Sequence, residues 1–268
     1  MKTFGIAAFL LLGSLALGAS AQTPEEQGLA IATEADLRDK GFGDSSATMR
    51  MILRNKQGNQ STREVRVRTL EIDDDGDKSL SIFDSPADVK GTAFLTFSHI
   101  LKPDDQWLYL PALKRVKRIS SKNKSGPFMG SEFAYEDISS DELEKYTYKY
   151  LRDETLDGVD TLVIERYPVD KHSGYIRQVV WFDKAEYRPQ KIDYYDRKDD
   201  HLKTLTFHEY RQYLDRFWRA MRYEMINHQT GKSTTLLWET YDFRTGLKDR
   251  DFDKNSLKRA KSAGWQWC

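Results

Sequence analysis

Histidine and cysteine side chains most often hold metals or act as nucleophiles, and this sequence arranges neither for such a task. No two histidines stand at the H-E-x-x-H spacing, and the single cysteine, Cys268, cannot build a structural zinc site or an internal disulfide. The sequence has no glycine-rich phosphate loop either. We therefore expect no metal and no cofactor. The five histidines are His99, His172, His201, His208 and His228.

Carboxylates and serines could supply two further kinds of chemistry. The acidic run Asp73–Asp77 suggests calcium, but with its glycine in the obligatory loop position, Ile82 falls where the bidentate Glu is needed. We interpret the run as a charged turn. The segment 43–47 lacks the second glycine of a nucleophile elbow. Neighbouring acids such as Glu136 and Asp137 leave acid–base hydrolysis open as an alternative, although we expect no enzyme.

A basic run is the strongest charge feature of the chain. One interpretation is a surface for acidic lipid headgroups or an acidic partner protein, and the other is a solvated strand face followed by a solvated loop. Lys+Arg and Asp+Glu are balanced at 42 each, which argues against nucleic acid as the main partner. The basic run comprises Lys114, Arg115, Lys117, Arg118, Lys122 and Lys124.

Methionine and aromatic side chains are abundant in the segments that alternate like strands. Such polarizable, adaptable side chains suit a cavity for flexible apolar chains, although they could also fill an ordinary core. The same segments carry Phe217, Trp218 and Tyr241. The residues we expect to line a ligand cavity are Met49, Met51, Phe94, Phe97, Trp107, Tyr109, Phe133, Tyr135, Trp181, Met221 and Trp238.

The elements that must position these residues are mostly strands. Thr23-Pro24-Glu25-Glu26 is a helix start, so we expect a helix over 22–40. We expect short helices after the capping sequence Ser139–Glu142 and over 249–261. Period-two alternation between short turns predicts an antiparallel meander, and so an open or closed barrel. The expected strands are 48–54, 64–69, 79–83, 92–98, 107–110, 114–119, 146–152, 161–167, 175–182, 190–195, 202–210, 217–226 and 233–241.

The N-terminal segment has the pattern of a cleaved signal peptide. Lys2 precedes the apolar run Phe4–Leu17, and Ala19-Ser20-Ala21 has the small residues that a signal peptidase requires. We predict cleavage after Ala21 and secretion to the periplasm. No later stretch is apolar for long enough to cross a bilayer. The remaining 22–268 shows neither linker nor repeat, so we expect one domain.

Three motifs in the middle of the chain resemble a known family. They are Asp105–Pro111, Lys114–Ile119 and Gly130–Asp137, with a weaker similarity at Pro189–Asp196. Their order resembles the outer-membrane lipoprotein-sorting proteins, the LolA-like periplasmic carriers, and within them the branch associated with RND-type exporters. No arginine of this sequence could be matched to the latch that controls cargo release in the lipoprotein carrier itself.

The resemblance implies a mainly β (α+β) fold: a strongly curved antiparallel sheet forming an unclosed barrel, with helices plugging the open side. It also implies a periplasmic carrier or binding protein for lipoprotein acyl chains or other lipid-like cargo, with an inner-membrane RND-type exporter as a partner. An exposed acyl chain costs about 0.8 kcal/mol per CH₂ in water, so such a carrier needs an apolar hollow. The alternative is a non-carrier periplasmic accessory module that uses the basic surface.

Overall fold

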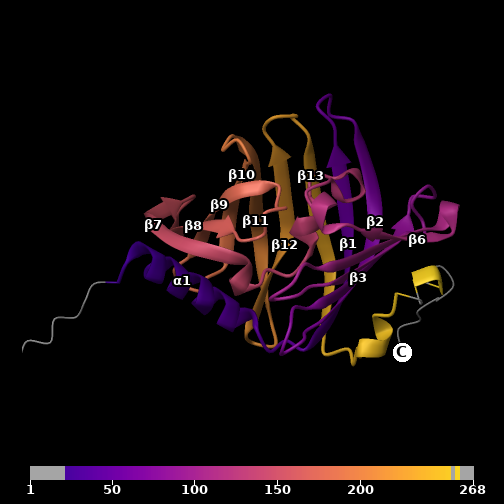
Figure 1. Ribbon diagram of the computed structural model, residues 1–268, viewed down its shortest axis with the longest axis horizontal. Coiled ribbons are helices and arrows are strands. Elements are labelled where there is room, and N and C mark those ends of the chain that lie inside the picture. The colour runs from indigo at the N-terminus through magenta and orange to yellow at the C-terminus, as the bar shows by residue number, and fades with distance from the viewer. Residues whose placement is uncertain (1–21, 255–256, 260–268) are drawn as a thin grey trace, which may run out of the picture.

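The computed structural model describes residues 22–254 and 257–259. Thirteen strands form one antiparallel sheet, which matches the expected open-barrel fold (Figure 1). Every strand expected from the alternation is confirmed. The strands are β1 (Asp44–Arg54), β2 (Gln60–Leu70), β3 (Lys78–Ser85), β4 (Ala93–Phe97), β5 (Asp105–Leu110), β6 (Arg115–Ile119), β7 (Tyr146–Leu156), β8 (Val159–Pro168), β9 (Tyr175–Asp183), β10 (Pro189–Asp196), β11 (His201–Tyr213), β12 (Phe217–Asn227) and β13 (Ser233–Phe243).

The strand order shows two meanders joined in the middle of the sheet. The order is β6-β5-β4-β3-β2-β1-β13-β12-β11-β10-β9-β8-β7, so β1 pairs with β13 and the strands β6 and β7 form the two edges. The chain must therefore travel from one edge of the curved sheet to the other between β6 and β7. The connection 120–145, which we call the plug, makes this crossing as a series of short 3-10 turns.

One α-helix begins the described chain. Helix α1 (Pro24–Asp39) starts with a capping box, in which the Thr23 hydroxyl accepts from the Glu26 backbone N–H and the Glu26 carboxylate accepts from the Thr23 backbone N–H. It packs against β7 near the edge of the sheet (Figure 1). The approach is close at Gly28, where an added Cβ would lie 2.7 Å from backbone atoms of Lys149 and Tyr150.

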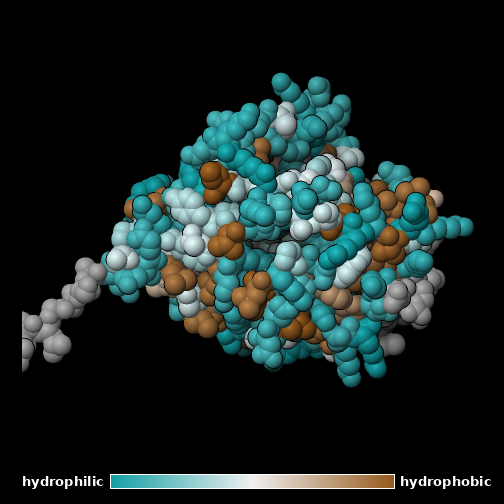
Figure 2. Space-filling model, in the orientation of Figure 1, coloured by the Kyte–Doolittle hydropathy of each residue, from teal (hydrophilic) through white to brown (hydrophobic). Residues whose placement is uncertain are grey.

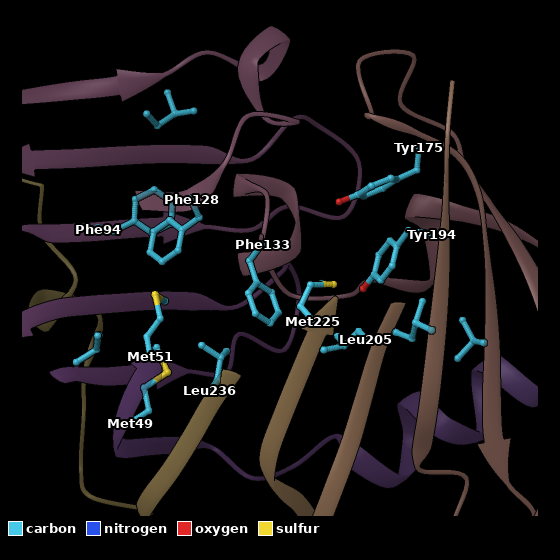
Figure 3. Packing of buried hydrophobic residues seen from close by; sticks show 14 of the residues in the cluster. Met49, Met51, Phe94, Phe128, Phe133, Tyr175, Tyr194, Leu205, Met225 and Leu236 are labelled. Atoms are coloured by element: carbon cyan, nitrogen blue, oxygen red, sulfur yellow. The ribbon is translucent and has the colours of Figure 1, made fainter. Parts of the chain in front are cut away.

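The plug fills much of the concave face of the sheet. Phe128 and Phe133 are almost fully buried in the main core, with the ring of Phe128 5.0 Å from that of Phe94 and 6.0 Å from that of Phe83. Figure 3 shows these plug rings among side chains from strands of both meanders, including Met51 and Met225. The interior over β1–β5 is therefore packed by the chain itself.

A buried ion pair ties the plug to the second meander. Lys203 donates from Nζ to the Asp137 carboxylate at 2.6 Å and to the Glu132 carbonyl at 3.0 Å. The Lys203 and Asp137 side chains are only 4% and 5% exposed. The Tyr175 hydroxyl also donates to Asp137. Because each charge is paired and hydrogen-bonded, burial is tolerated here.

Two smaller cores lie apart from the main one. The C-terminal segment places Phe252 and Leu257 against residues of β3–β6, including Leu95 and Tyr109. In Figure 1 the C-terminal turns lie on the side of β3 and β6, away from α1. Trp181 belongs to the third cluster, with neighbouring residues of β8 and β9.

The expected C-terminal helix is corrected by the structure. Of the span 249–261, the described residues form two 3-10 turns, Asp249–Asp251 and Leu257–Arg259. Phe252 leaves helical geometry and inserts into the second core instead. The short helix expected after Ser139–Glu142 is a 3-10 turn at Leu143–Lys145. The signal peptide and Cys268 lie outside the described residues.

Candidate functional site

A cavity of about 1020 Å³ opens between α1 and the concave face of the sheet. Its walls come from the C-terminal half of α1, the β2–β3 connection (71–77), the end of the plug (138–143) and the inner faces of β7–β13. Its volume is at the upper end of the range of about 300–1,000 Å³ typical of small-molecule pockets. The space left open on the concave face is thus at the α1 side rather than over β1–β5.

The floor of this cavity is aromatic. It includes Phe182 on β9, Trp218 on β12 and Tyr241 on β13, and the other floor rings are Phe207, Tyr210 and Tyr223. Trp238 lies next to this floor, with its ring 5.0 Å from that of Tyr241 and 6.0 Å from that of Tyr223. A floor of large flat rings can bury apolar ligand surface without long flexible side chains.

Local breaks in the strands decide which rings face the cavity. Phe207 and Tyr210 both line it although they are three residues apart, which strict alternation would forbid. Glu209, between them, has a φ of 59°, in the left-handed region. On β13 the register with β1 shifts between Thr48 and Met49, so the inner-facing positions change from Trp238 to Tyr241.

The floor also offers polar groups. The indole Nε1 of Trp218 and that of Trp238 are buried without a hydrogen-bond partner in the described structure. The Tyr210 hydroxyl donates to the Pro189 carbonyl. Burial raises the pKa of the Tyr210, Tyr223 and Tyr241 hydroxyls, so these groups stay neutral donors.

Arginines hold the C-terminal end of α1 over the cavity. Arg216 donates to the Leu37 carbonyl at 3.0 Å, and Arg219 pairs with Asp39. Arg38, from the helix itself, donates to the Ala185 carbonyl at 3.0 Å. The guanidinium groups suit the negative end of the helix dipole. Figure 2 shows a mostly hydrophilic surface with apolar patches over α1, where Leu29 and Leu37 are 49% and 54% exposed.

Acidic residues gather where the β2–β3 connection meets the plug. We call them the acidic corner, and all of them line the cavity. Glu71 accepts from the backbone N–H groups of Gly41 and Gly43, each at 2.7 Å. Asp75 accepts from the Ile100 N–H and from His99 Nδ1. The members of the acidic corner are Glu71, Asp73, Asp75, Asp77 and Glu142.

Two acids of this corner are strongly perturbed in opposite directions. Burial, and then the nearby Glu142 carboxylate, raise the pKa of Asp77 to about 7. Desolvation acts to raise the pKa of Asp75, but hydrogen bonds from the Ile100 N–H and from His99 together outweigh it and lower the pKa to about 2. The Ser140 hydroxyl links the two chain segments, since it accepts from the Asp77 N–H at 3.3 Å and donates to Glu142.

The ligand-cavity candidates from the sequence do not line this cavity. Six belong to the main core or pack against it, three to the core under the C-terminal segment, and Trp181 to the third cluster. Met221 is buried, with its sulfur 3.5 Å from the Tyr213 hydroxyl. Contact of these residues with cargo stays a prediction. The candidates in or against the main core are Met49, Met51, Phe94, Phe133, Tyr135 and Trp238. Those in or against the core under the C-terminal segment are Phe97, Trp107 and Tyr109.

The basic run forms part of a sheet edge. Arg115, Lys117 and Arg118 are exposed on β6, and Lys114 and Lys122 are exposed on either side of it. Lys124 turns inward instead and pairs with Asp170 at 2.8 Å. Within the described residues the β6 ladder runs to β5 alone. Use of this surface for a partner or headgroup stays a prediction.

Comparison with known proteins places the chain in a family. A family model described as "-like: Uncharacterized protein" matches residues 75–259. A domain from Vibrio parahaemolyticus, named as a candidate outer-membrane lipoprotein-sorting protein, is 62% identical over 88% of this chain and 100% of its own, with a TM-score of 0.86. The chain belongs to the LolA-like lipoprotein-sorting family.

Two further solved structures show how far the LolA-like fold extends. A DUF1329 family protein from Desulfovibrio piger is 32% identical over 88% of this chain and 100% of its own, with a TM-score of 0.84. A LolA superfamily protein from Nitrosomonas europaea, 21% identical over 85% and 98%, has a TM-score of 0.69 and shares the fold. No curated protein matches the chain.

Serines and carboxylates line the cavity, whereas no histidine or cysteine of the described residues does. In the same residues no three His, Cys, Asp or Glu side chains converge to hold a metal ion. None of the described helices is both long and apolar enough to span a membrane.

Proposed function

We propose that this protein is a periplasmic carrier or binding protein for lipoprotein acyl chains or other lipid-like cargo, and that it binds them in the cavity under α1. The observation that carries the proposal is an open volume of about 1020 Å³ with an aromatic floor, in a chain of the LolA-like family. Each CH₂ transferred from water to such a floor gains about 0.8 kcal/mol.

The arrangement of walls supports a carrier rather than a storage site. One wall is α1, which is held at its C-terminal end by hydrogen bonds and an ion pair that solvent reaches. Such exposed contacts are individually weak. The opposite wall is the sheet itself, anchored by the main core. Cargo could enter by displacing the helix end without opening the core.

Native mass spectrometry of gently purified protein tests the proposal. We expect a mass increment from bound lipid that is lost after delipidation and regained with added lipid. A matched pair of variants localises the ligand: Ala35→Trp fills the cavity from α1, and Ala30→Trp adds the same bulk at an exposed position of α1 outside it. Protein that is purified from the periplasm without bound lipid, and that takes up no added lipid, would contradict the carrier role.

The second candidate is a non-carrier accessory module, which the exposed cations on the edge strand β6 favour. An inner-membrane RND-type exporter is the partner we propose for either role. Crosslinking in cells separates the two candidates. A stable protein partner that is lost in the Arg115→Glu/Lys117→Glu variant, together with no bound lipid, would favour the module.

We also propose that the chain is exported and cleaved after Ala21, leaving a single domain over 22–268. The small residues at 19–21 after an apolar run support this. N-terminal sequencing of the periplasmic protein should begin at Gln22. A start at Met1, or retention of the protein in the cytoplasm, would contradict the proposal.

A further inference from the structure

The charge of the cavity lining is unbalanced. Eleven acidic and six basic residues line the cavity. An apolar pocket with balanced rim charges would bind cationic and anionic amphiphiles about equally. An excess of one sign, in a hollow with low-dielectric walls, focuses the potential and discriminates between them.

Five of the six basic residues of the lining are paired with neighbouring carboxylates. Lys40 pairs with Asp36 at 2.6 Å, Arg38 with Glu34 at 2.7 Å and Arg188 with Asp183 at 2.8 Å. Arg166 pairs with Asp141, and Arg219 with Asp39. The sixth, Arg216, donates to the Leu37 carbonyl. These contacts leave little positive charge free to receive an anionic headgroup.

The acidic corner has no Lys or Arg partner of this kind among the described residues, although Asp75 contacts the His99 ring and the raised pKa of Asp77 keeps that carboxyl partly protonated near neutral pH. In the described part of the chain, no Lys or Arg lies within ion-pair distance of its five members. Their hydrogen-bond partners are backbone N–H groups, the Ser140 hydroxyl and the His99 ring. The excess negative charge of the cavity is therefore concentrated at this corner, beside the C-terminal end of α1.

The aromatic floor independently favours a cation. Aromatic faces attract ammonium and guanidinium groups. The floor already demonstrates this with the chain's own arginine: the Arg188 guanidinium lies 4.4 Å from the Trp218 ring centre and 4.8 Å from that of Tyr210. Rings and carboxylates without a Lys or Arg partner in the described structure thus line the same cavity, which is the combination that recognises an amine beside an apolar chain.

We propose that the cavity selects amphiphiles with a cationic or amine-bearing headgroup and disfavours anionic ones, with the apolar chain on the aromatic floor and the amine at the acidic corner. This inference rests on the proposed carrier function and names its cargo class.

Three ligands with the same twelve-carbon tail test the selectivity: dodecyltrimethylammonium, dodecyl maltoside and laurate. Each is titrated into the full-length mature protein by calorimetry, below its critical micelle concentration and at low ionic strength. We expect the ammonium to bind roughly tenfold more tightly than laurate, with the maltoside between them. The preference should shrink at high salt.

Charge-removing variants locate the effect. Asp73→Asn changes an exposed member of the acidic corner, and Asp73→Asn/Glu142→Gln removes a second charge while keeping an acceptor for Ser140. Both should lower the ammonium-to-laurate ratio by more than they change the maltoside affinity. The matched control is Asp242→Asn, which removes an exposed charge next to Tyr241 but outside the cavity lining.

The outcomes separate this inference from the function on which it rests. Equal affinities for the two charged ligands, or tighter laurate, would overturn the selectivity while leaving the carrier role standing. A ratio that falls as much in Asp242→Asn as in Asp73→Asn would overturn the assignment to the acidic corner. Failure of all three ligands to bind would overturn the carrier proposal itself.

Discussion

The two halves of the concave surface of the sheet are covered in different ways. Over β1–β5 the plug covers the sheet with Phe128 and Phe133 and leaves a packed core. Over β7–β13 the covering element is α1, whose arginine-held end spans an open cavity instead. The difference shows that a loop whose rings insert into the core leaves no open volume, whereas a helix held over the sheet at its end leaves room for a guest.

Breaking the buried ion pair between Asp137 and Lys203 should have the largest effect on stability, because it destabilises the packed half of the molecule. Asp137→Ala leaves Lys203 charged and unpaired in the interior, and we expect a loss of about 3–5 kcal/mol in the free energy of unfolding. Urea unfolding measures it. Asp153→Ala, which breaks an exposed pair with Lys184, should cost less than about 1 kcal/mol. Similar losses in the two variants would show that the plug is not anchored by this pair.

Truncating a plug ring should come next. Phe128 is 1% exposed, and Phe128→Ala removes contacts with Phe94 and Phe83, so we expect destabilisation by about 3 kcal/mol. Leu37→Ala, on the cavity side of α1, removes a 54% exposed side chain and should cost under about 1 kcal/mol. Equal costs in urea unfolding would contradict the contrast between a packed and an open half.

The secondary-structure elements of both halves could be predicted from the sequence. Which half is packed and which is open could not. Alternation in strands such as β2 and the Thr23–Glu26 cap are local, so the sheet and α1 could be predicted. Trp107 and Tyr109, which we expected to line a ligand cavity, belong to or pack against the core that contains Phe252 and Leu257. No local pattern shows which face of a strand a distant segment will cover.

The residues of the cavity were harder to predict for a related reason. A one-residue break reverses every later inner-facing position. The left-handed Glu209 and the shifted register near Trp238 are such breaks, and they bring Tyr210 and Tyr241 to the floor. Phe182 lines the cavity while its neighbour Trp181 does not, and composition alone cannot distinguish the two.

Two tryptophans, one on the cavity floor and one in a packed cluster, test the comparison by ligand affinity rather than by stability alone. Trp218 on the cavity floor and Trp181 in the third cluster each have a buried, unpaired Nε1 and a cation above the ring. Trp218→Ala should weaken dodecyl maltoside binding about tenfold, because it removes floor area. Trp181→Ala should lower stability and leave affinity unchanged. Loss of affinity in both variants would place the cargo elsewhere.

The smallest expected effect is a pH dependence at the acidic corner. Burial beside Glu142 raises the pKa of Asp77 to about 7, while Glu71 and Asp39 add to the repulsion. The unfolded chain releases this proton near pH 4, so between pH 4 and 7 the folded state binds more protons. Stability from this group is therefore present at low pH and is lost as pH rises through about 7.

The variant Asp77→Asn isolates this contribution, since its amide keeps an oxygen that can accept from the Ile72 N–H. Between pH 6 and pH 8 the wild-type protein should lose about 1 kcal/mol of unfolding free energy relative to Asp77→Asn. Urea unfolding at the two pH values measures the difference, and Asp242→Asn should follow the wild type. A wild type that gains stability relative to Asp77→Asn over this range would mean that the carboxylate is stabilised there. In that case the acidic corner would hold a cation or a closer positive partner, and the open half would be less open than its geometry indicates.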